Sequence, residues 1–191
     1  MGVQAIGPAA RGLRAPAGTQ LLRQTYEPAA LPEGVVVVPQ RVAPDDAGGS
    51  FKEVVRLADG AVETAALLER GVAHKPAQLN VSVVAPGTRR FWHVHPSQSE
   101  LWTIAHGQLN AGLIDCRERS PTYGLRAKVV LTPLTSLYIP AGVAHGYANE
   151  SGATTVLLYL PDRQWSGGDA TEEWRIDPDE VPYDFVLAEV I

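Results

Sequence analysis

A series of short apolar segments, each closed by a turn, occupies the chain between residues 79 and 160. Pro, Gly, Ser or Asn residues separate the segments, and regular short strands with such breaks are typical of a β-sandwich or a β-barrel. One pattern, at residues 63–70, predicts a helix, and Gly71 is placed to end it. We therefore expect a mainly β protein. The expected strands are residues 79–84, 91–95, 101–105, 109–114, 127–131, 136–139, 145–149 and 154–160.

The segments on either side of this region differ from it in composition. Residues 1–33 are rich in Ala, Gly and Pro, so we expect a partly flexible N-terminal arm in which residues 21–26 form a strand. Residues 34–165 are expected to form the barrel domain. Residues 166–191 are loop-rich and acidic, and we expect them to be a tail that packs on the barrel.

Charge and residue usage exclude several classes of partner. The formal net charge is −5, and Arg89-Arg90 is the only basic cluster near the motifs described below, so we expect no nucleic-acid partner. No apolar run approaches the length of a membrane span, and the N-terminus lacks the apolar core of a secretory signal. We expect a soluble cytoplasmic protein without a membrane partner. Its one cysteine, Cys116, cannot form an internal disulfide.

Four candidate metal ligands stand in two turn-rich stretches. Residues two apart in a strand face the same way, so His93 and His95 are expected to point into one cavity. The turn-forming residues 96–99 let the chain reverse, which returns Glu100 to that cavity from the next strand. A second tight turn delivers His145 from a strand distant in sequence. Three imidazoles and one carboxylate suit Zn, Fe, Ni, Cu or Mn, so the sequence predicts a divalent transition-metal site.

Both stretches resemble the two signature motifs of the cupin superfamily. The first fits from Gly87, through the His-x-His pair and Glu100, to Gly107. The second fits from Pro140 to Asn149, although Leu134 stands where the family has its leading Gly. The resemblance implies an all-β fold in the main, a cupin or jelly-roll β-barrel with the metal inside, an N-terminal arm and one or two short helices.

A wider resemblance, from about Gly34 to Phe185, is to the dTDP-4-dehydrorhamnose 3,5-epimerase family, itself cupin-like. It implies a small-molecule substrate such as a nucleotide-linked sugar, and a homodimer in which N-terminal strands are exchanged or shared. The matching segments occur in the family's order and at its intervals. They are Gly34-Val-Val-Val-Val, Phe51-Lys-Glu53, Gln78-Leu-Asn80-Val-Ser82, Ser120-Pro-Thr-Tyr-Gly124, Leu137 to Gly146 and Trp174-Arg-Ile-Asp-Pro-Asp179.

The resemblance also implies roles for single residues. The family removes protons beside a sugar ketone and returns them to the opposite face, which requires a base, an acid on the other side and a group that stabilises the enolate. The family's base falls on His93 and its acid falls on Tyr159, while the Arg three residues before the base is retained as Arg90. Positions that contact the nucleotide-sugar in the family fall on Phe51, Glu53, Gln78 and Asn80.

Several residues of the family are replaced in this chain. The Lys that follows the base segment falls on Glu100, and the Arg of an early loop falls on Gly48. The C-terminal helix that carries an Asp supporting the base is missing. These replacements remove parts of the epimerase and add metal ligands, and a metal that polarises the ketone would replace the Lys.

Three functions follow from this combination. The predicted one is metal-assisted epimerisation or isomerisation of a keto-sugar, or of a related polar ketone, through an enolate. The alternatives are an Fe(II)-dependent oxygenase of a small-molecule intermediate and a sugar-binding cupin without catalysis. A His93 that ligated the metal would have no lone pair for a substrate proton. Tyr159 or a metal-bound hydroxide would then have to move the protons.

Overall fold

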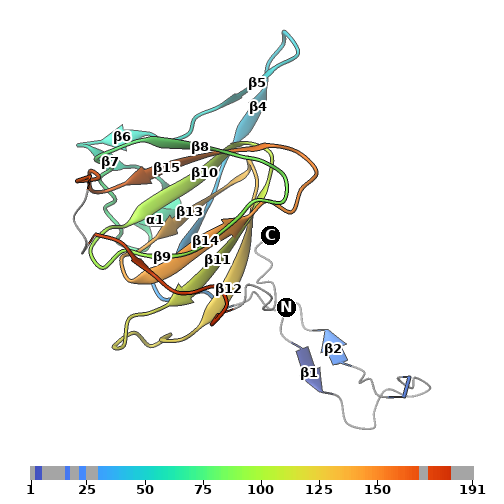
Figure 1. Ribbon diagram of the computed structural model, residues 1–191. Helices are drawn as coiled ribbons and strands as arrows, with labels where there is room; N and C mark the ends of the chain where they lie inside the picture. The colour runs from blue at the N-terminus through green and yellow to red at the C-terminus, as the bar shows by residue number, and fades with distance from the viewer. Residues whose placement is uncertain (1–2, 6–15, 18–21, 25–29, 168–171, 182–191) are drawn as a thin grey trace.

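A computed structural model describes residues 3–5, 16–17, 22–24, 30–167 and 172–181 (Figure 1). Of the expected arm strand, β2 (Leu22–Gln24) is described and pairs antiparallel with β1 (Val3–Ala5). The other expectations for residues 1–29 lie outside the described residues, as does most of the expected tail. Nowhere in the described ranges does a helix reach the length and apolar character that crossing a membrane requires.

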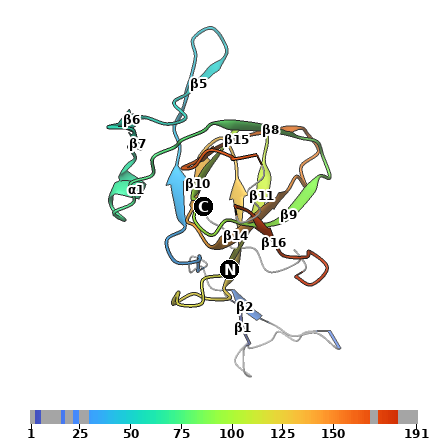
Figure 2. The ribbon, with the colours of Figure 1, turned by 60° about the vertical axis from the view of Figure 1, so that its left-hand side comes forward.

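Two five-stranded antiparallel sheets face each other and form the barrel (Figures 1 and 2). This arrangement confirms the predicted mainly-β jelly-roll fold. The first sheet has the order β3 (Val36–Pro39), β13 (Thr135–Ile139), β10 (Glu100–His106), β15 (Thr155–Pro161) and β8 (Asn80–Val84). The second has the order β12 (Arg126–Leu131), β11 (Leu109–Asp115), β14 (Val143–Ala148), β9 (Arg89–Val94) and β16 (Trp174–Arg175).

Small elements decorate the outside of the barrel. The pair β4 (Val42–Pro44) and β5 (Ser50–Lys52) extends away from it, and β6 (Leu57–Ala58) pairs with β7 (Ala61–Val62) (Figure 1). The only α-helix among the described residues is α1 (Ala65–Leu68), shorter than the expected 63–70. Thr64 begins it by accepting a hydrogen bond from the Leu67 amide, and Leu67 is its one buried residue.

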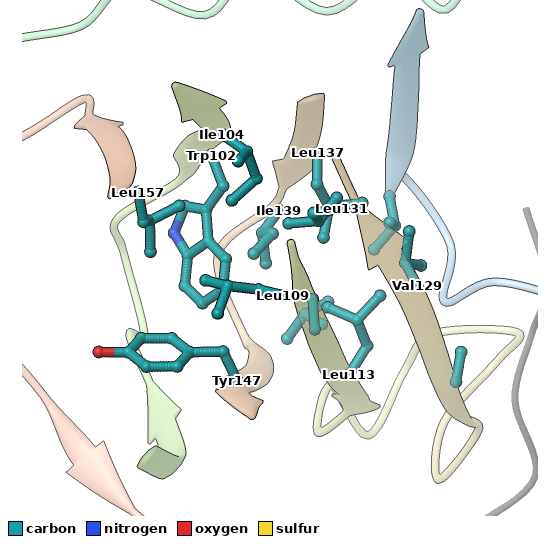
Figure 3. Close-up of a cluster of buried hydrophobic side chains, with 14 of the residues drawn as sticks. Trp102, Ile104, Leu109, Leu113, Val129, Leu131, Leu137, Ile139, Tyr147 and Leu157 are labelled. Carbon is teal, nitrogen blue, oxygen red and sulfur yellow. The ribbon is translucent and has the colours of Figure 1, made fainter. Parts of the chain in front are cut away.

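The alternation of side chains along β10 divides the interior from the outer layer. Trp102 and Ile104 belong to the apolar cluster between the two sheets, and Figure 3 shows them facing Leu109 and Tyr147 from the other sheet. Leu101 belongs instead to an outer cluster with residues of β3 and α1. The period of two therefore places Glu100 on the inner face with Trp102, next to the apolar core.

Gly146 brings β9 and β14 together beside the two motifs. A Cβ at this position would overlap the Phe91 ring and the Arg90 carbonyl oxygen, so only glycine permits this approach. The register of the two strands shifts between His145 and Tyr147, and His145 lies directly opposite His93. The irregularity thus sets the two imidazoles side by side on the inner face.

Candidate active site

A cavity of about 530 Å³ lies between the two sheets. Strands of both sheets contribute to its wall, and residues that follow β15 (Thr155–Pro161) complete it, namely Arg163, Trp165, Glu172 and Glu173. Eight of the ten residues predicted for catalysis, substrate binding or metal binding line this cavity. They are Gln78, Asn80, Arg90, His93, His95, Glu100, His145 and Tyr159.

The other two predicted residues, Phe51 and Glu53, do not line the cavity of their own chain. The carboxylate of Glu53 pairs with Arg56 at 2.9 Å on the surface. Phe51, which matches a family position of the same kind, is 66% exposed. Within a single chain, the structure therefore does not place either residue where it would contact a substrate in the cavity.

Three of the four predicted metal ligands form one buried group. Ligand atoms of His95, Glu100 and His145 all lie within 4.8 Å of one another. The Nε2 atom of His95 is 3.5 Å from Oε1 of Glu100, and Nε2 of His145 is 3.7 Å from Oε2 of the same carboxylate. One carboxylate thus faces two imidazole nitrogens.

The surroundings of this group fix which atoms face inward. Nδ1 of His95 bonds to the Glu172 carbonyl at 3.0 Å, and Nδ1 of His145 bonds to the Val143 carbonyl at 2.9 Å. A carbonyl only accepts, so each Nδ1 carries a proton, and in the neutral form of the ring Nε2 then presents its lone pair to Glu100. Burial lowers the pKa of His145, which favours this neutral form.

The carboxylate of Glu100 is also held in place. Gln98 Nε2 donates to Oε1 at 2.9 Å, and Trp102 Nε1 donates to Oε2 at 2.5 Å. Two imidazole nitrogens and one carboxylate, each oriented by a second hydrogen bond, fit a divalent transition metal. These residues are the ones that could hold such an ion.

His93 lies beside this group but is engaged by other residues. Its ring is nearly parallel to that of His145, with centroids 6.4 Å apart. Nδ1 of His93 is 2.8 Å from Oε1 of Glu173, and Nε2 accepts a hydrogen bond from Arg90 Nε at 3.1 Å. The structure therefore does not bring His93 into the three-residue group.

The electrostatic surroundings keep His93 neutral. Burial lowers the pKa of His93 to about 4, and the nearby charges of Arg175 and Arg90 add to this effect although Glu173 opposes it. Burial alone would raise the pKa of Glu173, but His93 and Arg175 outweigh it and hold that pKa below its usual value. At neutral pH a neutral imidazole therefore donates Nδ1–H to an ionised carboxylate.

Glu173 lines the cavity and contacts His93, and the sequence analysis did not identify it. The family places its supporting carboxylate in a C-terminal helix that is missing from this chain, whereas Glu173 stands just before the edge strand β16. That strand pairs Trp174 with Val94 and Arg175 with His93, which sets Glu173 over the imidazole. One feature of the sequence could have pointed to Glu173. It is an acidic residue directly before the Trp174-Arg175 segment, which carries part of the family resemblance.

Tyr159 faces the cavity from the other sheet. It lies on β15, opposite Trp102 on one side and Asn80 on the other. Within the described part of the chain its hydroxyl makes no hydrogen bond, whereas Gln78 donates to Asn80 at 2.6 Å and accepts from the Trp165 amide at 3.1 Å. His93 and Tyr159 thus approach the cavity from opposite sheets.

Comparison with known proteins agrees with the fold and with the wider family resemblance. Residues 30–182 match the sequence model of the family described as dTDP-4-dehydrorhamnose 3,5-epimerase. The spore coat polysaccharide biosynthesis protein SpsL of Bacillus subtilis is 31% identical over 103 residues, which cover 52% of this chain and 67% of that protein.

A second curated relative is an enzyme named for this activity. The dTDP-4-dehydrorhamnose 3,5-epimerase of Mycobacterium tuberculosis is 33% identical over 97 residues, which cover 46% of this chain and 48% of the enzyme. The chain thus spans about half the length of that relative. Among solved structures, a dTDP sugar isomerase from Desulfovibrio desulfuricans superposes with a TM-score of 0.64 at 25% identity, covering 79% of this chain and 90% of the other.

Proposed function

Because the chain belongs to the dTDP-4-dehydrorhamnose 3,5-epimerase family, we propose that it epimerises a nucleotide-linked keto-sugar or a related polar ketone through an enolate. In this proposal His93 is the base, and His95, Glu100 and His145 hold a divalent metal. The observation that carries it is the pairing of His93 with Glu173. That pairing leaves base chemistry and metal binding to different residues.

Proton removal is assigned to Nε2 of His93. A neutral imidazole whose Nδ1–H is held by a carboxylate keeps its Nε2 lone pair oriented into the cavity. Glu173 accepts that Nδ1–H and stabilises the imidazolium that forms when the proton is taken from the carbon beside the ketone. It would thereby take the part of the Asp that the family places in its C-terminal helix.

In this proposal the three metal-binding residues replace the family's Lys, which this chain lacks and which would stabilise the enolate. A divalent cation on His95, Glu100 and His145 would supply positive charge beside the ketone oxygen. The fixed Nε2 lone pairs and the doubly hydrogen-bonded carboxylate support this assignment. The same two-His, one-carboxylate set favours an Fe(II) oxygenase as the second candidate function.

Proton exchange and oxygen uptake distinguish the two candidates. We expect incubation with a dTDP-4-keto-6-deoxy sugar in D₂O to place deuterium beside the carbonyl, at the positions named in the family's 3,5-epimerase activity, without oxygen consumption. Proton NMR of the sugar and an oxygen electrode read the two quantities in one reaction. Oxygen consumption without deuterium would support the oxygenase. Binding with neither would support a sugar-binding cupin.

The roles of base and acid can be separated with Tyr159→Phe. We expect this variant to keep deuterium exchange, because His93 still removes the proton and can return a deuteron to the same face. Inversion should fall by roughly 10²–10⁴-fold, the usual worth of a positioned acid. Proton NMR of product stereochemistry measures this. The matched control is Tyr138→Phe in the outer cluster. Normal inversion in Tyr159→Phe would remove Tyr159 from the mechanism.

The assembly that supports this function is proposed to be a homodimer. The edge strand β8 exposes Val81 at 58% and Val83 at 72%, and the β4–β5 pair carries the exposed Phe51 away from the barrel. A second copy would cover these apolar residues. It would also explain why Phe51 and Glu53, which match substrate-contacting positions of the family, lie outside the cavity of their own chain.

Sedimentation velocity tests the proposed dimer. We expect the wild-type chain to sediment as a dimer and Val83→Lys to shift it towards monomer, because a charge would be buried at the contact. Leu134→Lys, at another exposed apolar residue in the turn before β13, is the control and should leave the dimer intact. A wild-type monomer would contradict the assignment.

A further inference from the structure

Arg90 occupies the lone pair that the proposed base needs. Its Nε atom donates to His93 Nε2 at 3.1 Å while Nδ1 of the same ring is held by Glu173. Both ring nitrogens are therefore engaged. A lone pair that accepts a hydrogen bond from a guanidinium cannot take a proton from carbon at the same time. In the structure as it stands, the base is masked.

The guanidinium of Arg90 has no anionic partner among the described residues. Its neighbour Arg89 pairs with Glu150 at 3.1 Å, and Arg175 pairs with Glu173 at 2.8 Å. Arg90 instead donates its Nε–H to the neutral imidazole of His93, and it lines the cavity. Arg163 lines the cavity as well, and over the described ranges it bonds only to the Ser97 carbonyl. The cavity wall thus presents two cations that have no carboxylate partner in the described part of the chain.

A substrate that carries a diphosphate would compete for Arg90. A guanidinium binds phosphate oxygens through two parallel hydrogen bonds, and the opposite charges of the two groups add a Coulomb attraction that a neutral imidazole does not offer. Transfer of the Arg90 donors from the imidazole to the anion is therefore favourable. It would leave Nε2 of His93 with a free lone pair directed into the cavity.

We infer that Arg90 is a latch on the His93 base, which an anionic group of the substrate releases when it binds. The catalytic meaning of this latch rests on the proposed function, whereas the exchange of hydrogen bonds does not. The consequence is a selection of substrate class. A ketone with a phosphate or diphosphate activates its own base, and a neutral sugar of the same shape leaves the base masked.

Nitrogen NMR of the histidine ring tests the latch without any turnover. The whole 191-residue chain is labelled with ¹⁵N-histidine and treated with a chelator, so that added inorganic pyrophosphate finds no cation to bind. We expect pyrophosphate to move the His93 Nε2 resonance downfield, away from the position of a hydrogen-bonded acceptor. Arg90→Met keeps the aliphatic stem without the donor, so its resonance should start at the shifted position and stay there.

The matched control is Arg89→Met, which should respond to pyrophosphate as the wild type does. Three results would overturn the inference. They are a wild-type resonance that already coincides with that of Arg90→Met, one that stays in place at saturating pyrophosphate, and a shift that also occurs in Arg90→Met. If pyrophosphate does not bind, the resonance stays in place, and this outcome overturns the inference in the same way as the second result. Failure of the proposed function would appear instead as missing deuterium exchange, which this measurement does not involve.

Discussion

Replacing His93 with Gln is expected to lower the rate of solvent deuterium exchange into the keto-sugar by roughly 10²–10⁴-fold, the range for loss of a positioned general base. Gln fills a similar space but offers no basic nitrogen, and the hydrogen bond that holds Nδ1 on Glu173 is replaced by an amide contact. Proton NMR of the sugar in D₂O measures the rate. Inversion should fall together with exchange, unlike in Tyr159→Phe.

A second buried histidine provides the control for this variant. His74 bonds to Ser99 Oγ at 3.1 Å and to the Leu160 carbonyl at 2.9 Å, and it does not line the cavity. His74→Gln should therefore leave exchange close to that of the wild type. An His93→Gln protein that exchanged protons at the wild-type rate would show that another group is the base.

Replacing Asp115 with Asn is expected to give the largest loss of stability. Asp115 is almost completely buried at the end of β11, and its carboxylate accepts bonds from Arg117, Ser120 and Thr122. Arg117 also donates to the Glu33 carbonyl, so the network ties the start of the barrel domain to the loop after β11. An Asn would leave Arg117 without its charged partner.

The expected cost is about 3 kcal/mol, which for a chain of this size corresponds to a Tm lower by roughly 6–12 °C. Burial would raise the pKa of Asp115, but the bonds from Arg117, Ser120 and Thr122 outweigh it and hold that pKa well below its usual value. A depressed pKa stabilises the fold above the pKa of the unfolded carboxyl. The difference between wild type and variant should therefore shrink as the pH falls below about 4.

Thermal unfolding followed by circular dichroism at several pH values measures this difference. The control is Asp45→Asn, because Asp45 is exposed and its side chain accepts a bond from the amide of Ala47 in its own loop. Its Tm should stay near that of the wild type. An Asp115→Asn protein as stable as the wild type at neutral pH would show that the network adds nothing to stability.

The sequence predicted the barrel because the period of two and the turns are local features. The predicted helix was longer than the observed one because an apolar pattern does not show which side chains are buried. Residues 63–70 contain enough apolar residues for two turns, but only Leu67 is buried, while Leu68 is 61% exposed. One side chain packed on the outer face of the sheet stabilises a single turn, which Thr64 caps.

Most residues that line the cavity could be predicted from the sequence, but their hydrogen-bond partners could not. Spacing places His93 and His95 on the inner face, and both line the cavity. Spacing does not say which partner each ring nitrogen meets. That depends on Glu173, about eighty residues later, whose place is set by the pairing of β16 with β9. The family resemblance places Glu53 in the site, but Arg56, three residues later, holds its carboxylate on the surface.

Elemental analysis of protein purified without added metal tests most directly whether His93 is separate from the metal group. The wild type and His93→Gln are compared with His145→Gln and Glu100→Gln. Circular dichroism confirms that each variant is folded. The account predicts near-stoichiometric divalent metal in the wild type and in His93→Gln, and its loss in the other two. Loss of the metal from His93→Gln, or no metal in the wild type, would contradict it.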